Sequence, residues 1–129
     1  MNILILSAGG PTAHGAIKSL RDINFDGKIV SIDSNPLSAG FYLSDSYYIV
    51  PKAFEDGYVE RIWSIVNKEK IDLILPTSSN DIVTLSKNNH LFENKLFMSD
   101  YEAIDICSDK LKFYEKCKDK FPLPKTSID

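Results

Sequence analysis

The chain has 129 residues, of which 43% are hydrophobic and 26% are charged, and its formal net charge at pH 7 is −3. This length suits one compact domain, and the composition is that of an ordinary globular protein, which excludes disordered and fibrous classes. Lysines are densest over residues 108–120, where acidic residues alternate with them as on a solvent-exposed helix face. No one-sided basic surface is visible, so we expect no nucleic-acid partner.

The cysteines and the apolar runs exclude two further classes. Cys107 and Cys117 are ten positions apart, without CxxC spacing or a histidine cluster, so no metal or redox site is expected. No basic segment precedes the first apolar run, and no run approaches the roughly 18 residues that a membrane-spanning helix needs. We expect a cytoplasmic protein with no membrane partner.

The chain begins with a strand, a helix and a second strand. Residues 2–7 form an apolar run without polar alternation, which is typical of a parallel strand buried on both faces. Residues 12–23 space their apolar side chains helically, and Thr12 is the predicted N-cap. Residues 28–33 form the second strand, which ends at Asp33.

The alternation continues to the end of the chain. Further strands are predicted at 46–50, 71–77 and 95–99. The intervening and following helices are predicted at 56–70, 80–92, 101–107 and 110–119. Such alternation predicts an α/β fold, a Rossmann-like open parallel sheet of about five strands with helices on both faces. We expect this domain to span 1–121, and the proline-containing segment 122–129 to be a linker toward a further domain.

Ligands of open α/β sheets bind outside the carboxyl ends of the strands, which directs attention to the loops 7–12, 33–36, 76–81 and 99–101. In the first loop, Gly9 and Gly10 could bring the backbone close to a phosphate at the start of the next helix. They could equally serve only as a turn from strand to helix. The dinucleotide fingerprint G-x-G-x-x-G is not met, because the next glycine is Gly15, and this favours the turn.

The second and third loops also admit two interpretations each. Asp33 lies 23 residues after Gly10, near where dinucleotide-binding folds place an acid for the ribose, but Asp33 and Asn35 could instead hold a turn, which we favour. Thr77 and Ser78 could donate hydrogen bonds to a carboxylate or phosphate, while Ser79 or Asn80 could cap the next helix. These two roles are compatible.

The sequence contains no catalytic constellation that we could identify. His14 has no adjacent acid or nucleophile, so a surface or packing role is favoured for it, and His90 lies in a polar loop. There is no Ser/His/Asp triad, no pair of carboxylates in an acid/base setting and no metal-ligand spacing. We therefore predict no catalytic residue and no metal ligand in this chain.

The order of the motifs resembles the N-terminal pre-ATP-grasp domain of ATP-grasp ligases, and the closest similarity is to the large subunit of carbamoyl phosphate synthase. The resemblance covers essentially the whole chain. It is carried by ILILSAGG, by SNP with SDSYYIVP downstream, by ILPTSSND, and by the block from SDK to FPLPKT.

The resemblance implies a Rossmann-like domain that forms the substrate side of a larger ligase. The implied substrate-binding residues are Gly9, Gly10, Asn35, Thr77 and Ser78. Lys110 occupies the family's position for a basic residue that contacts ATP phosphate, whereas spacing alone favours a solvated lysine at a helix start. ATP and Mg would bind mainly to later domains of the full-length parent, so the 129 residues alone are not expected to turn over ATP.

The expected partners are a downstream ATP-grasp domain of the same parent chain, a small-molecule substrate and a second copy in a homodimer. The parent would form an acyl phosphate from ATP and a carboxylate or bicarbonate, and would transfer the acyl group to an amine. The alternative is a stand-alone nucleotide- or dinucleotide-binding Rossmann module without catalysis. A third hypothesis is an interaction domain that mediates dimerisation.

Overall fold

The structure is a computed structural model that describes residues 1–125. The chain divides into two compact units, Met1–Met98 and a second unit that begins at Ser99. The expected linker at 122–129 lies partly outside the described residues. The domain boundary expected at residue 121 stays a prediction.

The first unit is built on a parallel sheet. Its strands are β1 (Asn2–Ile5), β2 (Lys28–Asp33), β3 (Ser46–Ile49) and β4 (Leu73–Leu75), in the order β3-β2-β1-β4. The predicted open parallel α/β sheet is confirmed, with four strands instead of about five. The expected strand at 95–99 is reduced to one bridge, between Leu96 and Ile74. It ends there because the Met98 N–H turns back to the Leu96 carbonyl, at 3.2 Å.

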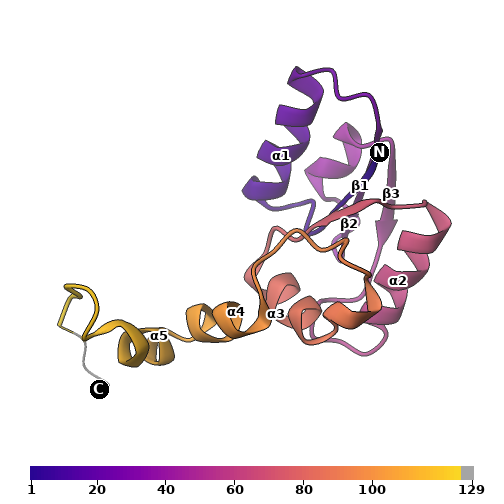
Figure 1. Cartoon of the computed structure of the whole chain (residues 1–129). Coiled ribbons are helices and arrows are strands. Elements are labelled where there is room, and N and C mark those ends of the chain that lie inside the picture. The colour runs from indigo at the N-terminus through magenta and orange to yellow at the C-terminus, as the bar shows by residue number, and fades with distance from the viewer. Residues whose placement is uncertain (126–129) are drawn as a thin grey trace. The chain divides into compact units, whose positions relative to one another are not determined.

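Helices cover both faces of this sheet, as predicted (Figure 1). α1 (Pro11–Asp22) packs Ala13 and Ile17 against Ile3 and Ile5 of β1. α2 (Tyr58–Lys68) and α3 (Ser79–Lys87) pack on the opposite face, against Leu4 and Leu6. Successive strand side chains point to opposite faces, so the uninterrupted apolar runs of the strands supply both cores. Two 3₁₀ turns, η1 (Ala39–Leu43) and η2 (Asn89–Leu91), complete the first unit.

α1 begins at Pro11, and its N-cap is Gly10, so the predicted N-cap at Thr12 is wrong. The reason is that proline is well suited to the first helical position, where its fixed φ fits the helix and its missing N–H would have no intrahelical acceptor. The helix therefore starts one residue before the threonine.

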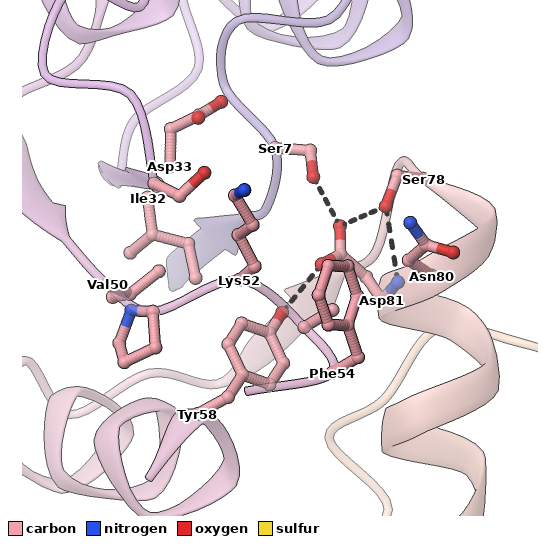
Figure 2. Close-up of a pocket in the computed structure, with 13 residues that line it drawn as sticks. Ser7, Ile32, Asp33, Val50, Lys52, Phe54, Tyr58, Ser78, Asn80 and Asp81 are labelled. Atoms are coloured by element: carbon pink, nitrogen blue, oxygen red, sulfur yellow. Dashed lines mark hydrogen bonds between the residues drawn. The ribbon is translucent and has the colours of Figure 1, made fainter. Parts of the chain in front are cut away.

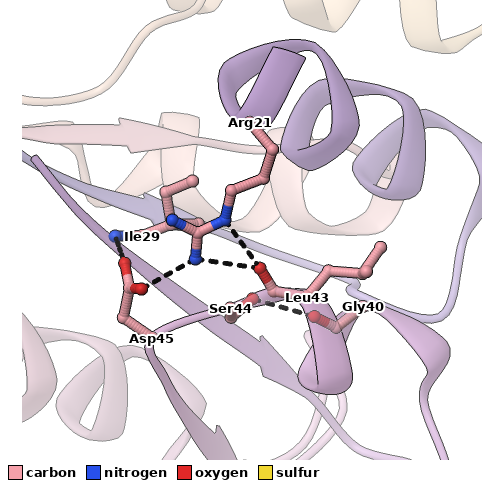
Figure 3. A network of polar contacts seen from close by, with 6 residues as sticks. All are labelled: Arg21, Ile29, Gly40, Leu43, Ser44 and Asp45. Carbon is pink, nitrogen blue, oxygen red and sulfur yellow. Dashed lines mark hydrogen bonds and ion pairs between the residues drawn. The ribbon is translucent and has the colours of Figure 1, made fainter. Parts of the chain in front are cut away.

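The other end of α1 is tied to the segment that enters β3 (Figure 3). The Arg21 guanidinium donates to the Leu43 carbonyl at 3.0 Å and to Asp45 Oδ1 at 2.8 Å. The Ile29 N–H donates to the other oxygen of Asp45 at 2.7 Å. Burial alone would raise the pKa of Asp45, but the hydrogen bonds from Ile29 and Arg21 outweigh it, and the pKa lies below its usual range. This network fixes where the edge strand begins.

The second unit contains the two predicted helices, α4 (Tyr101–Ser108) and α5 (Lys110–Cys117). Aspartates cap both helices, since Asp100 accepts from the Ala103 N–H at 2.8 Å and Asp109 accepts from the first amides of α5. Asp105 of α4 pairs with Lys112 of α5 at 2.8 Å. Within the described residues, 1–125, no helix is long and apolar enough to cross a membrane.

Candidate functional site

A cavity of about 240 Å³ opens at the carboxyl ends of the strands in the first unit (Figure 2). Its walls come from the loops that follow β1, β2 and β3 and from the start of α3. The polar side chains in these walls are Ser7, Asp33, Ser34, Lys52, Tyr58, Ser78, Asn80 and Asp81. In open parallel sheets this edge is where ligands bind, so the cavity is the candidate functional site.

A buried aspartate organises one wall of the cavity. Asp81 is only 4% exposed. Its Oδ2 accepts hydrogen bonds from the Ser7 hydroxyl at 2.6 Å and from the Ser78 hydroxyl at 2.8 Å. Its Oδ1 accepts from the Tyr58 hydroxyl at 2.7 Å. Three elements far apart in the sequence therefore meet at one carboxylate, which we call the Asp81 cluster.

Tyr58 stays a hydrogen-bond donor throughout the physiological pH range. Burial, and then the charge of Asp81 and the hydrogen bond to it, raise the pKa of Tyr58 far above its usual value. A hydroxyl group has a single proton, and Ser7, Ser78 and Tyr58 all direct that proton to Asp81. These three side chains consequently offer acceptor lone pairs, and no donor, to a ligand in the cavity.

The glycine loop is tightly integrated into the fold. The Gly9 N–H donates to Asp33 Oδ2 at 2.7 Å, and the Gly10 N–H donates to the Ser7 carbonyl at 2.9 Å. A Cβ atom on Gly9 would lie 2.9 Å from the Ser38 hydroxyl oxygen, too close for an ordinary contact. The loop therefore serves as a strand-to-helix turn, which is the interpretation that the spacing favoured. Contact of Gly9 and Gly10 with a substrate stays a prediction.

Asp33 and Asn35 hold the turn after β2, as the favoured interpretation predicts. The Asn35 N–H donates to Asp33 Oδ1 at 2.8 Å, and the Leu37 N–H donates to Asn35 Oδ1 at 3.0 Å. Because the other oxygen of Asp33 accepts from Gly9, the acid joins two strand-end loops. The side-chain amide group of Asn35 donates no hydrogen bond within residues 1–125, and its substrate role stays a prediction.

Thr77 and Ser78 follow β4. The Thr77 hydroxyl donates to the Leu6 carbonyl at 2.6 Å. Ser78 is the N-cap of α3 and accepts from the Asp81 N–H at 3.2 Å, so the expected cap at Ser79 or Asn80 is wrong. The extended backbone of Ser78 lets the helix begin at Ser79, one residue earlier than expected. Of the five predicted substrate residues, only Ser78 lines the cavity.

Lys110 belongs to the second unit, where it is the exposed first residue of α5. Its contact with nucleotide stays a prediction.

Sequence reasoning missed Lys52, which lines the cavity from the loop after β3. The signal was present, since Lys52 follows directly on Pro51, at which the third predicted strand ends. Over the described ranges, no three His, Cys, Asp or Glu side chains are grouped so as to hold a metal ion.

Comparison with protein families settles the relationship. Residues 3–97 match the model of the PylC-like N-terminal domain, which is well over half of the chain. The chain belongs to the PylC-like N-terminal domain family. The assignment to the N-terminal, pre-ATP-grasp domain of an ATP-grasp ligase is confirmed. No curated protein matches the sequence of this chain.

Solved structures share the fold of this PylC-like domain. It resembles a structure described as glycinamide-RNase-transformylase T from Mycobacterium tuberculosis, with 12% identity over 98% of this chain and a TM-score of 0.72. N5-carboxyaminoimidazole ribonucleotide synthetase from Thermotoga maritima is 22% identical over 96% of this chain, with a TM-score of 0.68. The biotin carboxylase domain of Hydrogenobacter thermophilus 2-oxoglutarate carboxylase is 19% identical over 91% of this chain, with a TM-score of 0.62.

The PylC-like domain covers only part of each of these proteins. It spans 37%, 32% and 27% of the three chains, in the order given. The similarity therefore describes one domain of larger proteins.

Proposed function

We propose that this chain is the N-terminal, substrate-side domain of an ATP-dependent ligase similar to the large subunit of carbamoyl phosphate synthase. The family match over residues 3–97 carries the proposal. The cavity at the strand ends supports it, because it is a small polar site of the kind that a substrate of this class would use. The cytoplasmic location and the homodimer expected from the sequence belong to the same proposal.

In the proposed reaction, an oxygen of the carboxylate or bicarbonate substrate attacks the γ-phosphorus of ATP. The bond between that phosphorus and the β–γ bridging oxygen breaks, which releases ADP and leaves an acyl phosphate. The amine nitrogen then attacks the acyl carbon, phosphate leaves, and the nitrogen loses a proton. Positive groups around the transferring phosphoryl group stabilise its charge, which is the role assigned to Lys110.

ATP and Mg are the proposed cofactors of the complete protein. One similar structure, N5-carboxyaminoimidazole synthetase from Staphylococcus aureus, is a complex with ADP, at 19% identity. The Hydrogenobacter domain is described as a dimer in complex with MgADP, ADP and bicarbonate. A downstream ATP-grasp domain in the same parent chain would supply most of the nucleotide site.

Thermal unfolding separates this proposal from a free-standing nucleotide-binding module. The measurement compares the 129-residue chain with a protein extended by the coding sequence that follows Asp129, each with Mg-ATP, with NAD and without ligand. A ligand that binds only the folded state raises the unfolding temperature. We expect Mg-ATP to stabilise only the extended protein. Stabilisation of the 129 residues alone by NAD would favour the stand-alone module.

The acyl phosphate itself can be tested in the extended protein by trapping it with hydroxylamine as a hydroxamate. We expect a hydroxamate that depends on both Mg-ATP and the acid substrate. Lys110→Met should raise the KM for ATP roughly tenfold, because one charged hydrogen bond to phosphate is lost. Lys120→Met, at an exposed lysine of the same unit, is the matched control and should leave that KM unchanged.

A further inference from the structure

The cavity at the strand ends contains a cation that has no partner among residues 1–125. We propose that Lys52 binds a carboxylate or phosphate group of the ligand in this cavity. The inference rests on the proposed function in one respect only, that this ligand is the substrate of the ligase. It adds a residue that neither the motifs nor the family resemblance indicated.

Lys52 is held at its backbone and left free at its side chain. Its N–H donates to Glu55 Oε2 at 2.8 Å, and its carbonyl accepts from the Glu55 N–H at 2.9 Å. This turn orients an exposed side chain that lines the cavity and points into it in Figure 2. Among residues 1–125, the ammonium group of Lys52 has no ion-pair or hydrogen-bond partner.

Three hydroxyl groups that line the cavity have already used their donors. The hydroxyls of Ser7, Ser78 and Tyr58 donate to Asp81. The backbone amides of Gly9 and Asn35, which do not line the cavity, donate to Asp33. An anionic group that enters the cavity therefore finds the ammonium of Lys52 as its charged donor.

Two uncharged side chains can assist Lys52. Ser34 and Asn80 line the same cavity, and neither side chain makes a hydrogen bond within the described residues. Both are exposed, so they lie where a ligand would enter from solvent. A hydrogen bond from an ammonium group to an oxyanion is stronger than a bond between neutral groups, so Lys52 supplies most of the affinity.

The charges of the cavity favour a carboxylate over a phosphate dianion. Its charged side chains are Asp33, Asp81 and Lys52. One positive charge faces two negative ones at this site, and a dianion would be repelled more strongly by the carboxylates than a monoanion. The carboxylate group of a small acid is therefore the expected ligand, and a phosphate group is the other source of the same chemistry.

An NMR titration of the ¹⁵N-labelled 129-residue chain tests the proposal. Sodium acetate and sodium phosphate are added separately at constant ionic strength, and amide shifts are followed for the loops around the cavity. We expect saturable shifts at residues 33–35, 52–55 and 78–81, with acetate bound more tightly. Lys52→Met, which keeps the length of the side chain and removes its charge, should weaken binding about tenfold.

Lys70→Met is the matched control. Lys70 is an exposed lysine of the same unit, in the turn after α2, and it forms no ion pair in the part of the chain that the structure describes. This variant should bind as the wild type does. A wild-type pattern of well-dispersed amide signals in both variants shows that each has kept its fold.

Saturable binding of acetate, of phosphate or of both that is lost in Lys52→Met supports the site, and the probe that binds identifies the anionic group. Absence of saturable shifts in the wild type, or equal binding by Lys52→Met, overturns it. The titration needs neither nucleotide nor turnover. A chain that binds acetate through Lys52 while the extended protein forms no acyl phosphate would refute the proposed function alone.

Discussion

Two nearly buried acids, Asp81 and Glu69, lie at opposite edges of the same sheet and are satisfied in different ways. At the carboxyl edge, Asp81 accepts three hydroxyl groups and has no ion-pair partner within the described chain. At the amino edge, the side chain of Glu69 is 10% exposed and pairs with Lys28 at 2.5 Å, while the Tyr48 hydroxyl also donates to it.

The two acids differ in whether a lysine or a set of neutral hydroxyl groups satisfies them. At the amino edge, Lys28 pairs with Glu69, and their hydrogen bond raises the pKa of Lys28 and lowers that of Glu69. At the carboxyl edge, neutral hydroxyls satisfy the acid. Under our proposal, Lys52 at this edge is the cation that a ligand pairs with.

The strongest test of this contrast removes the acid of the carboxyl edge. Asp81→Ala should lower the free energy of unfolding by about 3 kcal/mol. The reason is that three hydroxyl donors lose their common acceptor, and one of them, the hydroxyl of Tyr58, belongs to a buried side chain. Urea denaturation measures the change. Asp56→Ala, at an exposed aspartate, is the control and should stay within about 0.5 kcal/mol of wild type. Equal effects of the two substitutions would contradict the role of the cluster.

Two glycines of the first unit should respond differently to an added Cβ, because only one of them lies in the packed loops of the carboxyl edge. A Cβ on Gly40 would lie 2.5 Å from the Ala8 carbonyl oxygen, in the packed loops of the carboxyl edge. We expect Gly40→Ala to cost about 2 kcal/mol by overpacking. A Cβ on Gly15, in α1, would meet no atom within 4 Å, so Gly15→Ala should cause no loss by overpacking. Thermal unfolding should show the larger loss for Gly40→Ala, and equal losses would refute this reasoning.

The two tyrosines allow a milder comparison. Tyr58→Phe removes a buried donor from Asp81 and should cost about 1.5 kcal/mol, since hydrogen bonds to charged groups are the stronger ones. Tyr48→Phe leaves Glu69 its ion pair with Lys28 and should cost about 0.5 kcal/mol. Parallel urea titrations of the two variants measure the difference. Similar losses would mean that the two edges are held alike.

The smallest expected effect is the pH dependence of the amino edge. The pKa of Glu69 is lowered by the hydrogen bonds from Lys28 and then Tyr48, so its stabilisation is present above the unfolded value of about 4.3 and is lost as the pH falls through the folded pKa. Glu69→Gln should therefore be less stable than wild type at pH 7, by less than about 1 kcal/mol, and the gap should close near pH 3.

Denaturant unfolding at the two pH values checks this prediction, and the wild type supplies the reference at each. Asp45 also loses stabilisation in acid, because its pKa is lowered, but it does so in both proteins and cancels in the comparison. A gap that stays constant between pH 7 and pH 3 would show that Glu69 contributes no charge-dependent stability.

Much of the fold could be predicted from the sequence because its signals are local. The apolar runs at 2–7, 28–33 and 71–77 and the helical stripe of Tyr58, Ile62, Ile65 and Val66 report burial directly. Boundaries were predicted less well. Whether Leu96 forms a strand or a single bridge depends on what pairs with Ile74, which lies elsewhere in the chain.

The candidate site was predicted only in outline. The rule that ligands bind at the carboxyl ends of strands selected the loops after β1, β2 and β4, and these loops do line the cavity. Applied to the loop after β3, the same rule would have selected Lys52. The family motifs pointed to Gly9 and Thr77, whose hydrogen-bonding groups the structure places in internal contacts.

By itself, the sequence determined the α/β class, the parallel sheet and the edge at which to seek a ligand, since each follows from the periodicity and order of short segments. Only the tertiary structure decided which polar groups are satisfied. Ser7 and Asp81 are 74 positions apart, and their hydrogen bond depends on how β1 and α3 come together. Whether Lys52 has a partner is equally a property of neighbours in space, which no local pattern records.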